Sequence, residues 1–182
     1  MARRRGPAGT AGATSRRAPR SARGVTARTS AGPPDTNEKI EAMTTFPTIA
    51  FKDVETPGAG TAVVLAADGV ELGPVGRALD EAADGLIAAA AGTAKFKGKA
   101  RKALSLYAPR GLALDRLIVM GTGKPGEAEE FDWVRLGGAI AAEIQGDPEA
   151  TIVLERADGT PVTADQAADV GLGICLRSYK FD

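Results

Sequence analysis

A glycine-rich segment is the first place where this sequence could do chemistry. Residues 121–126 read Gly-Thr-Gly-Lys-Pro-Gly and match the G-x-G-x-x-G pattern of dinucleotide-binding loops. In such loops the backbone approaches a pyrophosphate at the N-terminus of a helix. Here Pro125 stands where the helix should begin, and Glu127, Glu129 and Glu130 would repel a phosphate. We therefore interpret the segment as a strand-to-helix connection and keep phosphate binding as the alternative.

A cluster of cations is the second candidate. It places five of them within eight residues, at Lys95, Lys97, Lys99, Arg101 and Lys102. One interpretation is a patch for nucleic acid or phosphate. We favour a solvated loop that leads into a strand, because the part of the chain around it is acidic overall. The three glutamates after the glycine-rich segment are likewise interpreted as solvated charge and not as a metal cluster.

The residues that the sequence lacks exclude much familiar chemistry. There is no histidine, so this chain alone cannot build a Ser-His-Asp triad, a Cys-His pair or an H-E-x-x-H zinc helix. Cys175 is the single cysteine, which excludes an internal disulfide, and we expect it to be a small core residue. The longest apolar stretch, residues 86–91, is far shorter than the roughly 20 residues needed to cross a bilayer. We expect a soluble chain with no membrane partner.

The charge distribution divides the chain into two parts. Residues 1–34 contain eight arginines and no acid, with one valine as the only larger aliphatic residue after Met1. Such a composition cannot bury a core, so residues 1–42 are predicted to be a disordered, Arg-rich leader. Met43 is a candidate translation start, and targeting or nucleic-acid binding by the leader is the alternative. Residues 43–182 have the composition and length of one folded domain.

From Phe46 onward, short β-branched runs alternate with Ala-rich helical stretches, which is typical of the α/β class. Turns are predicted at Asp68-Gly69 and Asp158-Gly159. Pro74 suits the first turn of a helix, Asp132 can cap a second, and Thr163 with Gln166 forms a capping box before a third. The predicted strands cover residues 48–52, 61–66, 104–107, 114–120 and 151–154.

The apolar pattern predicts which face each helix buries. Residues 75–91 form one amphipathic stripe and are predicted to be a single helix packed on a sheet. Gly137-Gly138 lowers helix propensity, so we expect close backbone packing there. Trp133 is expected to be a core residue on the same helix. The last helix is predicted to pack through one side that carries Ala168, Leu172, Cys175 and Tyr179.

Three segments, taken in order, resemble the N-terminal domain of the leucyl aminopeptidase (cytosol aminopeptidase) family. They are residues 96–99 leading into LSLYAP, the run LDRLIVMGTGK with the helix FDWVRLGGAIAAEI, and residues 167–182 (AADVGLGICLRSYKFD). The resemblance covers about residues 46–182, and its most specific piece is the closing LRSYKFD, which resembles the family's segment just before the linker into the catalytic domain. It implies an α/β fold with a mixed sheet and flanking helices, similar to a macro domain.

The same resemblance implies a function for the complete protein. Family members are two-domain metallopeptidases that remove N-terminal residues, notably leucine, from peptides. Their C-terminal domain holds two divalent ions, typically zinc or manganese, and they are typically cytoplasmic hexamers. The family's metal-binding stretch, of the type N-T-D-A-E-G-R, has no match here. We therefore expect a chain truncated before the catalytic domain, and we assign it no catalytic, cofactor-binding or metal-binding residue. It should be inactive alone, with peptide bound only through the missing domain.

Two other functions stay open at this point. The first is a stand-alone macro-like module that binds a nucleotide or ADP-ribose near residues 121–126. The second is nucleic-acid binding through the leader and residues 95–102, which the acidic character of the rest of the chain disfavours.

Overall fold

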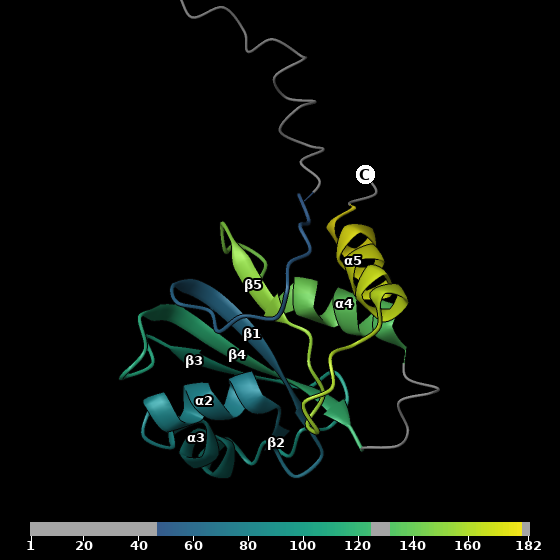
Figure 1. Cartoon of the computed structure of the whole chain (residues 1–182). Coiled ribbons are helices and arrows are strands. Elements are labelled where there is room, and N and C mark those ends of the chain that lie inside the picture. Colours follow the sequence, from purple (N-terminus) through teal and green to yellow (C-terminus); the bar gives the residue numbers. More distant parts are fainter. Residues whose placement is uncertain (1–46, 125–131, 180–182) are drawn as a thin grey trace, which may run out of the picture.

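The computed structural model describes residues 47–124 and 132–179, and these form a sheet with helices on both faces (Figure 1). The five strands are β1 (Gly60–Ala67), β2 (Glu71–Leu72), β3 (Ala103–Tyr107), β4 (Leu114–Gly123) and β5 (Ala150–Val153). Four of them lie in the order β2-β1-β4-β3, and β5 also pairs with β1. β1 is parallel to β4 and β5 but antiparallel to β2, and β3 is antiparallel to β4. The predicted α/β class and mixed sheet are confirmed.

The four helices of the described residues divide between the two faces of this sheet. They are α2 (Pro74–Ala82), α3 (Leu86–Ala94), α4 (Trp133–Glu143) and α5 (Ala164–Ser178). Leu117 and Val119 of β4 point into a core with α2 and α3, whereas Ile118 and Met120 point into a core with α4 and α5. All four of these side chains are fully buried. This confirms that the apolar run predicted as residues 114–120 is a strand covered on both faces.

The segment 48–52 is not a strand, so that prediction is wrong. Ile49 is partly buried against the core beneath α4 and α5, while Phe51 is 63% exposed. Both side chains lie beside Gly171 of α5. The segment therefore packs its apolar residues against a helix and does not pair with a strand.

The single helix predicted over residues 75–91 is two helices. Asp84 and Gly85 lie between α2 and α3, and both have left-handed backbone conformations, with φ of 59° and 77°. The Asp80 carboxylate accepts a hydrogen bond of 2.6 Å from the backbone N–H of Ile87 in the first turn of α3. Leu79 and Ile87 are nevertheless both buried against the sheet. The apolar stripe is therefore kept although the helix is broken.

The helix starts follow the predicted local signals. Pro74 occupies the first turn of α2. The Asp132 side chain caps α4 by accepting a hydrogen bond of 2.8 Å from the N–H of Arg135. Thr163 and Gln166 form the predicted capping box at the start of α5. These contacts satisfy backbone donors that a helix leaves without partners.

The expected close packing at Gly137 is confirmed. A Cβ at Gly137 would overlap the carbonyl oxygen of Val170 in α5, and a Cβ at Gly173 would overlap the carbonyl oxygen of Val134 in α4. The two helices therefore lie in backbone contact, and each supplies a glycine to the crossing. Trp133 begins α4 and is 7% exposed, as expected of a core residue.

The buried face of α5 differs from the predicted one. Val170 and Ile174 are buried, whereas Leu172 is 50% exposed and Tyr179 is 48% exposed. Cys175 is only partly buried. Backbone contact with α4 requires small residues at the crossing, so the helix turns its glycines and branched residues inward and its larger side chains outward.

Both predicted turns are present. Asp68-Gly69 joins β1 to β2, and Gly69 has φ of 84°. In the second turn the N–H and the hydroxyl of Thr160 donate to Asp158, at 2.9 and 2.6 Å. These bonds hold the pKa of the Asp158 carboxyl below its usual value, and the bond from the Thr160 hydroxyl has the larger effect.

Candidate functional site

The glycine-rich end of β4 is packed against the chain's own basic loop, residues 95–102. The N–H of Gly121 donates to the carbonyl of Lys102 at 2.7 Å, and the N–H of Gly123 donates to the carbonyl of Gly98 at 2.9 Å. A Cβ at Gly121 would overlap the carbonyl oxygen of Lys99. Gly121 is therefore required by the close approach of the basic loop. Gly123 is required by its left-handed backbone, because its φ is 84°.

This packing decides against phosphate binding at Gly121 and Gly123. A phosphate-binding loop presents free backbone N–H groups to its anion, and here both of these N–H groups already have carbonyl partners. The structure supports the interpretation of the segment as a structural connection. Gly126, Pro125 and the acidic residues 127, 129 and 130 lie outside the described residues.

The basic loop itself has exposed side chains and a fixed backbone. All five of its cations are exposed, while Phe96 packs against the core beneath α2 and α3. The carbonyl of Lys97 accepts from the N–H of Gly69 at 3.0 Å, and the N–H of Arg101 donates to the carbonyl of Gly121 at 2.8 Å. A Cβ at Gly98 would overlap the carbonyl oxygen of Ala67, the last residue of β1. The loop is thus held against the ends of β1 and β4 through its backbone, which leaves its charges to solvent as predicted.

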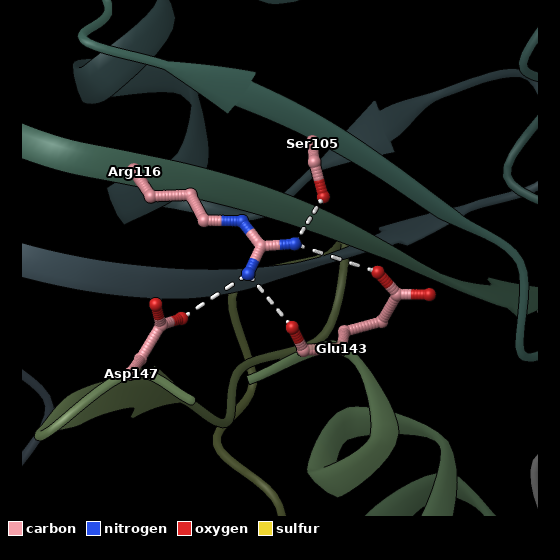
Figure 2. A network of polar contacts seen from close by, with 4 residues as sticks. All are labelled: Ser105, Arg116, Glu143 and Asp147. Carbon is pink, nitrogen blue, oxygen red and sulfur yellow. Dashed lines mark hydrogen bonds and ion pairs between the residues drawn. The ribbon is translucent and has the colours of Figure 1, made fainter. Parts of the chain in front are cut away.

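Arg116 of β4 is the centre of the most extensive polar network of the described residues (Figure 2). Its Nη1 donates to the carbonyl of Glu143 at 2.7 Å and to Oδ2 of Asp147 at 3.2 Å. Its Nη2 donates to Oγ of Ser105 in β3 at 3.0 Å and lies 3.6 Å from the Glu143 carboxylate. The guanidinium carbon lies 5.0 Å from the ring centroid of Tyr107.

This network fits a structural role. The Arg116 side chain is only 13% exposed, and one guanidinium joins β3, β4 and the C-terminal end of α4. A cation at the last carbonyl of a helix is favourable because it neutralises the negative end of the helix dipole. No local sequence signal marks Arg116, because its partners come from β3 and from the end of α4 with the turn that follows it.

Glu155 is a buried polar residue that no local sequence signal marks. It is 6% exposed, and its Oε1 accepts from the N–H of Val75 at 2.6 Å and from the N–H of Gly76 at 3.3 Å. These are donors of the first turn of α2, whose own N-cap residue, Gly73, has no side chain to offer. A carboxylate from the segment after β5 therefore caps a helix whose residue Val75 lies 80 residues earlier in the sequence.

The described residues do not fit a divalent metal centre. Within residues 47–124 and 132–179 there is no group of three or more His, Cys, Asp and Glu side chains that could hold a metal ion. The acids near Arg116 are hydrogen-bonded or ion-paired with its guanidinium. In the same ranges, no helix has both the length and the apolar character that a membrane span requires.

The comparison with protein families identifies the fold that these elements form. A profile of the "Cytosol aminopeptidase family, N-terminal domain" matches residues 63–182, which is well over half of the chain. The chain belongs to the cytosol aminopeptidase family. The family resemblance found in the sequence is confirmed, and the match falls on the N-terminal domain.

Individual members of the cytosol aminopeptidase family are similar over the same part of the chain. A probable cytosol aminopeptidase of Chelativorans sp. (strain BNC1) is 41% identical over 140 residues, covering 77% of this chain and 28% of that relative. One from Rhodopseudomonas palustris (strain TIE-1) is 41% identical over 135 residues, covering 74% of this chain and 27% of the relative. The chain thus spans under a third of the length of the curated relatives that it matches.

A solved structure shares the fold. A mutant tomato leucine aminopeptidase is 21% identical and superposes with a TM-score of 0.52, over 75% of this chain and 30% of that one. At this identity the likeness shows the fold alone. The predicted similarity to a macro domain is not confirmed by these comparisons.

Proposed function

We propose that residues 43–182 are the non-catalytic N-terminal domain of a metalloaminopeptidase that removes N-terminal residues, notably leucine, from peptides. The observation that carries the proposal is the family match over residues 63–182, which falls on the N-terminal domain. Residues 1–42 lie outside this domain in the proposal.

The buried polar groups of the chain also support a non-catalytic role. Arg116 holds two strands and a helix end together, and Glu155 caps α2. The glycine-rich segment is packed under the basic loop. Nη1 and Nη2 of Arg116, Oε1 of Glu155 and the N–H groups of Gly121 and Gly123 are all hydrogen-bonded within the domain.

In this proposal, the chemistry belongs to a catalytic part that these 182 residues do not contain. That part would hold two divalent ions, zinc or manganese, which would supply Lewis-acid chemistry for peptide hydrolysis. The relatives' name supports a cytoplasmic enzyme, and the resemblance found in the sequence supports a homo-oligomer, a hexamer.

A chimera tests the proposal directly. The 140 matched residues of the Chelativorans sp. relative are replaced by the corresponding residues of this chain, and metal-dependent hydrolysis of a leucyl amide is measured. We expect the chimera to turn over substrate, whereas the relative with the matched segment deleted should lose activity. The 182-residue chain should be inactive even with added manganese. Turnover by that chain after repurification would contradict the proposal, and so would a folded but inactive chimera.

A further inference from the structure

The outward side of α5 is apolar. Leu172 is 50% exposed, Leu176 is 60% exposed and Tyr179 is 48% exposed. The exposed residues Ala168, Leu172 and Leu176 are spaced four apart and share one side of the helix, which we call the α5 outer face. The opposite side carries Val170 and Ile174, which are buried against α4 and the sheet.

A helix that is apolar on two opposite sides is typical of a position between two layers of protein. The described residues cover only one of these sides, because α4 and the sheet pack against the Val170 side. Phe51 extends the apolar surface, since it is 63% exposed and its ring lies beside Gly171 of the same helix. Exposed apolar side chains gathered on one helix in this way favour an interaction site.

We propose that the α5 outer face is the docking surface for the part of the polypeptide that follows the N-terminal domain in this family. This inference rests on the proposed function. More than two thirds of the Chelativorans sp. relative lies outside the match. α5 (Ala164–Ser178) is the last described element, and its outer face reaches the last turn of the helix at Leu176. A segment joined to the chain near this point meets the face at a high effective concentration, so a small surface suffices.

The same observations disfavour two other occupants. A stable contact between separate molecules takes about 20–30 residues on each side, whereas the α5 outer face and Phe51 supply only a few. The leader supplies little apolar material, because residues 1–34 contain Val25 as the only larger aliphatic residue after Met1.

The single cysteine allows a direct test. Cys175 is partly buried and precedes Leu176 on α5, so its alkylation rate reports whether the α5 outer face is covered. Alkylation at Cys175, located by mass spectrometry, is compared between the 182-residue chain and the chimera described above. We expect alkylation to be slower in the chimera by about tenfold or more, the factor that corresponds to burying one leucine side chain.

Two matched variants complete the design. The double variant Leu172→Lys/Leu176→Lys should restore fast alkylation in the chimera while leaving the melting temperature of the 182-residue chain nearly unchanged. Val54→Lys alters an apolar residue that is also exposed, at 45%, but outside the α5 outer face. It should leave the protection of Cys175 intact. Lysines are chosen because Asp169 lies nearby on the helix and because cations are favourable near a helix C-terminus.

The alkylation rate and the activity of the chimera together separate the docking surface from the proposed function. Equal alkylation in the 182-residue chain and the chimera would overturn the inference, as would a concentration-dependent dimer of the 182-residue chain that the double variant abolishes. An active chimera with unprotected Cys175 refutes the docking surface alone, whereas an inactive chimera with protected Cys175 refutes the proposed function alone. If the chimera is insoluble, a cysteine at the aligned position of the intact Chelativorans sp. relative gives the same comparison.

Discussion

The crossing of α4 and α5 gives a prediction in which two neighbouring glycines have opposite effects. A Cβ at Gly137 would lie closer than 3.0 Å to the carbonyl oxygen of Val170, a distance that real Cβ contacts essentially never show. A Cβ at Gly138, one residue on, would lie 3.8 Å from the carbonyl oxygen of Gly173, which is ordinary contact. Both glycines are interior residues of the same helix.

The magnitudes follow from two competing effects. Alanine gains about 1 kcal/mol over glycine in a helix interior. At Gly137 this gain is outweighed, because the overlapped atom belongs to the backbone and α5 must move as a unit. Overpacking costs about 1–3 kcal/mol, and an overlap with backbone atoms falls in the upper part of that range, at about 2–3 kcal/mol. We expect Gly137→Ala to lower the free energy of unfolding by about 1–2 kcal/mol and Gly138→Ala to raise it by up to about 1 kcal/mol.

Urea unfolding followed by fluorescence measures both variants. Trp133 is the single tryptophan, it begins α4, and it is 7% exposed, so its emission reports on this interface. Gly173→Ala should behave like Gly137→Ala, because its Cβ would overlap the carbonyl oxygen of Val134. The reasoning is refuted if Gly137→Ala is as stable as the wild type, or if Gly138→Ala is destabilised to the same extent.

Three further predictions test the other packed groups. Gly121→Ala should destabilise the domain by about 1–3 kcal/mol in thermal unfolding, because its Cβ would overlap the basic loop. The control is Gly92→Ala in α3, whose Cβ meets nothing within 4 Å, and it should be neutral or stabilising by up to about 1 kcal/mol. Arg116→Met should lower the free energy of unfolding in urea by about 3 kcal/mol. The Arg135 side chain is 73% exposed, so Arg135→Met should change stability by less than about 0.5 kcal/mol. Equal effects of the two variants would contradict a structural network. Glu155→Ala should cost about 1–3 kcal/mol by leaving the first turn of α2 uncapped, with a smaller loss for Glu155→Gln, and a neutral alanine variant would show that water replaces the carboxylate.

The features that the sequence predicted well depend on neighbours in sequence. The capping contacts of Asp132 and Thr163 involve residues three positions away, so they can be read directly from the chain. The strand over residues 114–120 was predictable because alternate side chains point to opposite faces, and an apolar residue at every position from Leu117 to Met120 requires cover on both.

The features that it missed depend on partners that are distant in sequence. On α5, the periodicity of large apolar residues selected the side with Leu172 and Tyr179, but the helix buries Val170 and Ile174. Large residues at a crossing keep two helix backbones apart. Whether the backbones of α4 and α5 touch depends on the path of α4, which the sequence of α5 does not show. The break at Asp84-Gly85 was missed for a related reason, since the apolar stripe continues through it.

The same distinction explains what could be inferred about the site. The sequence showed that proline and acids disfavour a phosphate at residues 121–126, but it gave no reason for the glycines themselves. For Gly121 that reason lies in residues 98–102, whose backbone leaves no room for a Cβ. For Gly123 it lies in a φ of 84°. The side chains of Arg116 and Glu155 are hydrogen-bonded to the domain's own backbone, whereas Leu172 and Leu176 of α5 are exposed to solvent. Under the proposed function the domain acts through the surfaces that it presents, and the alkylation of Cys175 measures whether α5 contributes one of them.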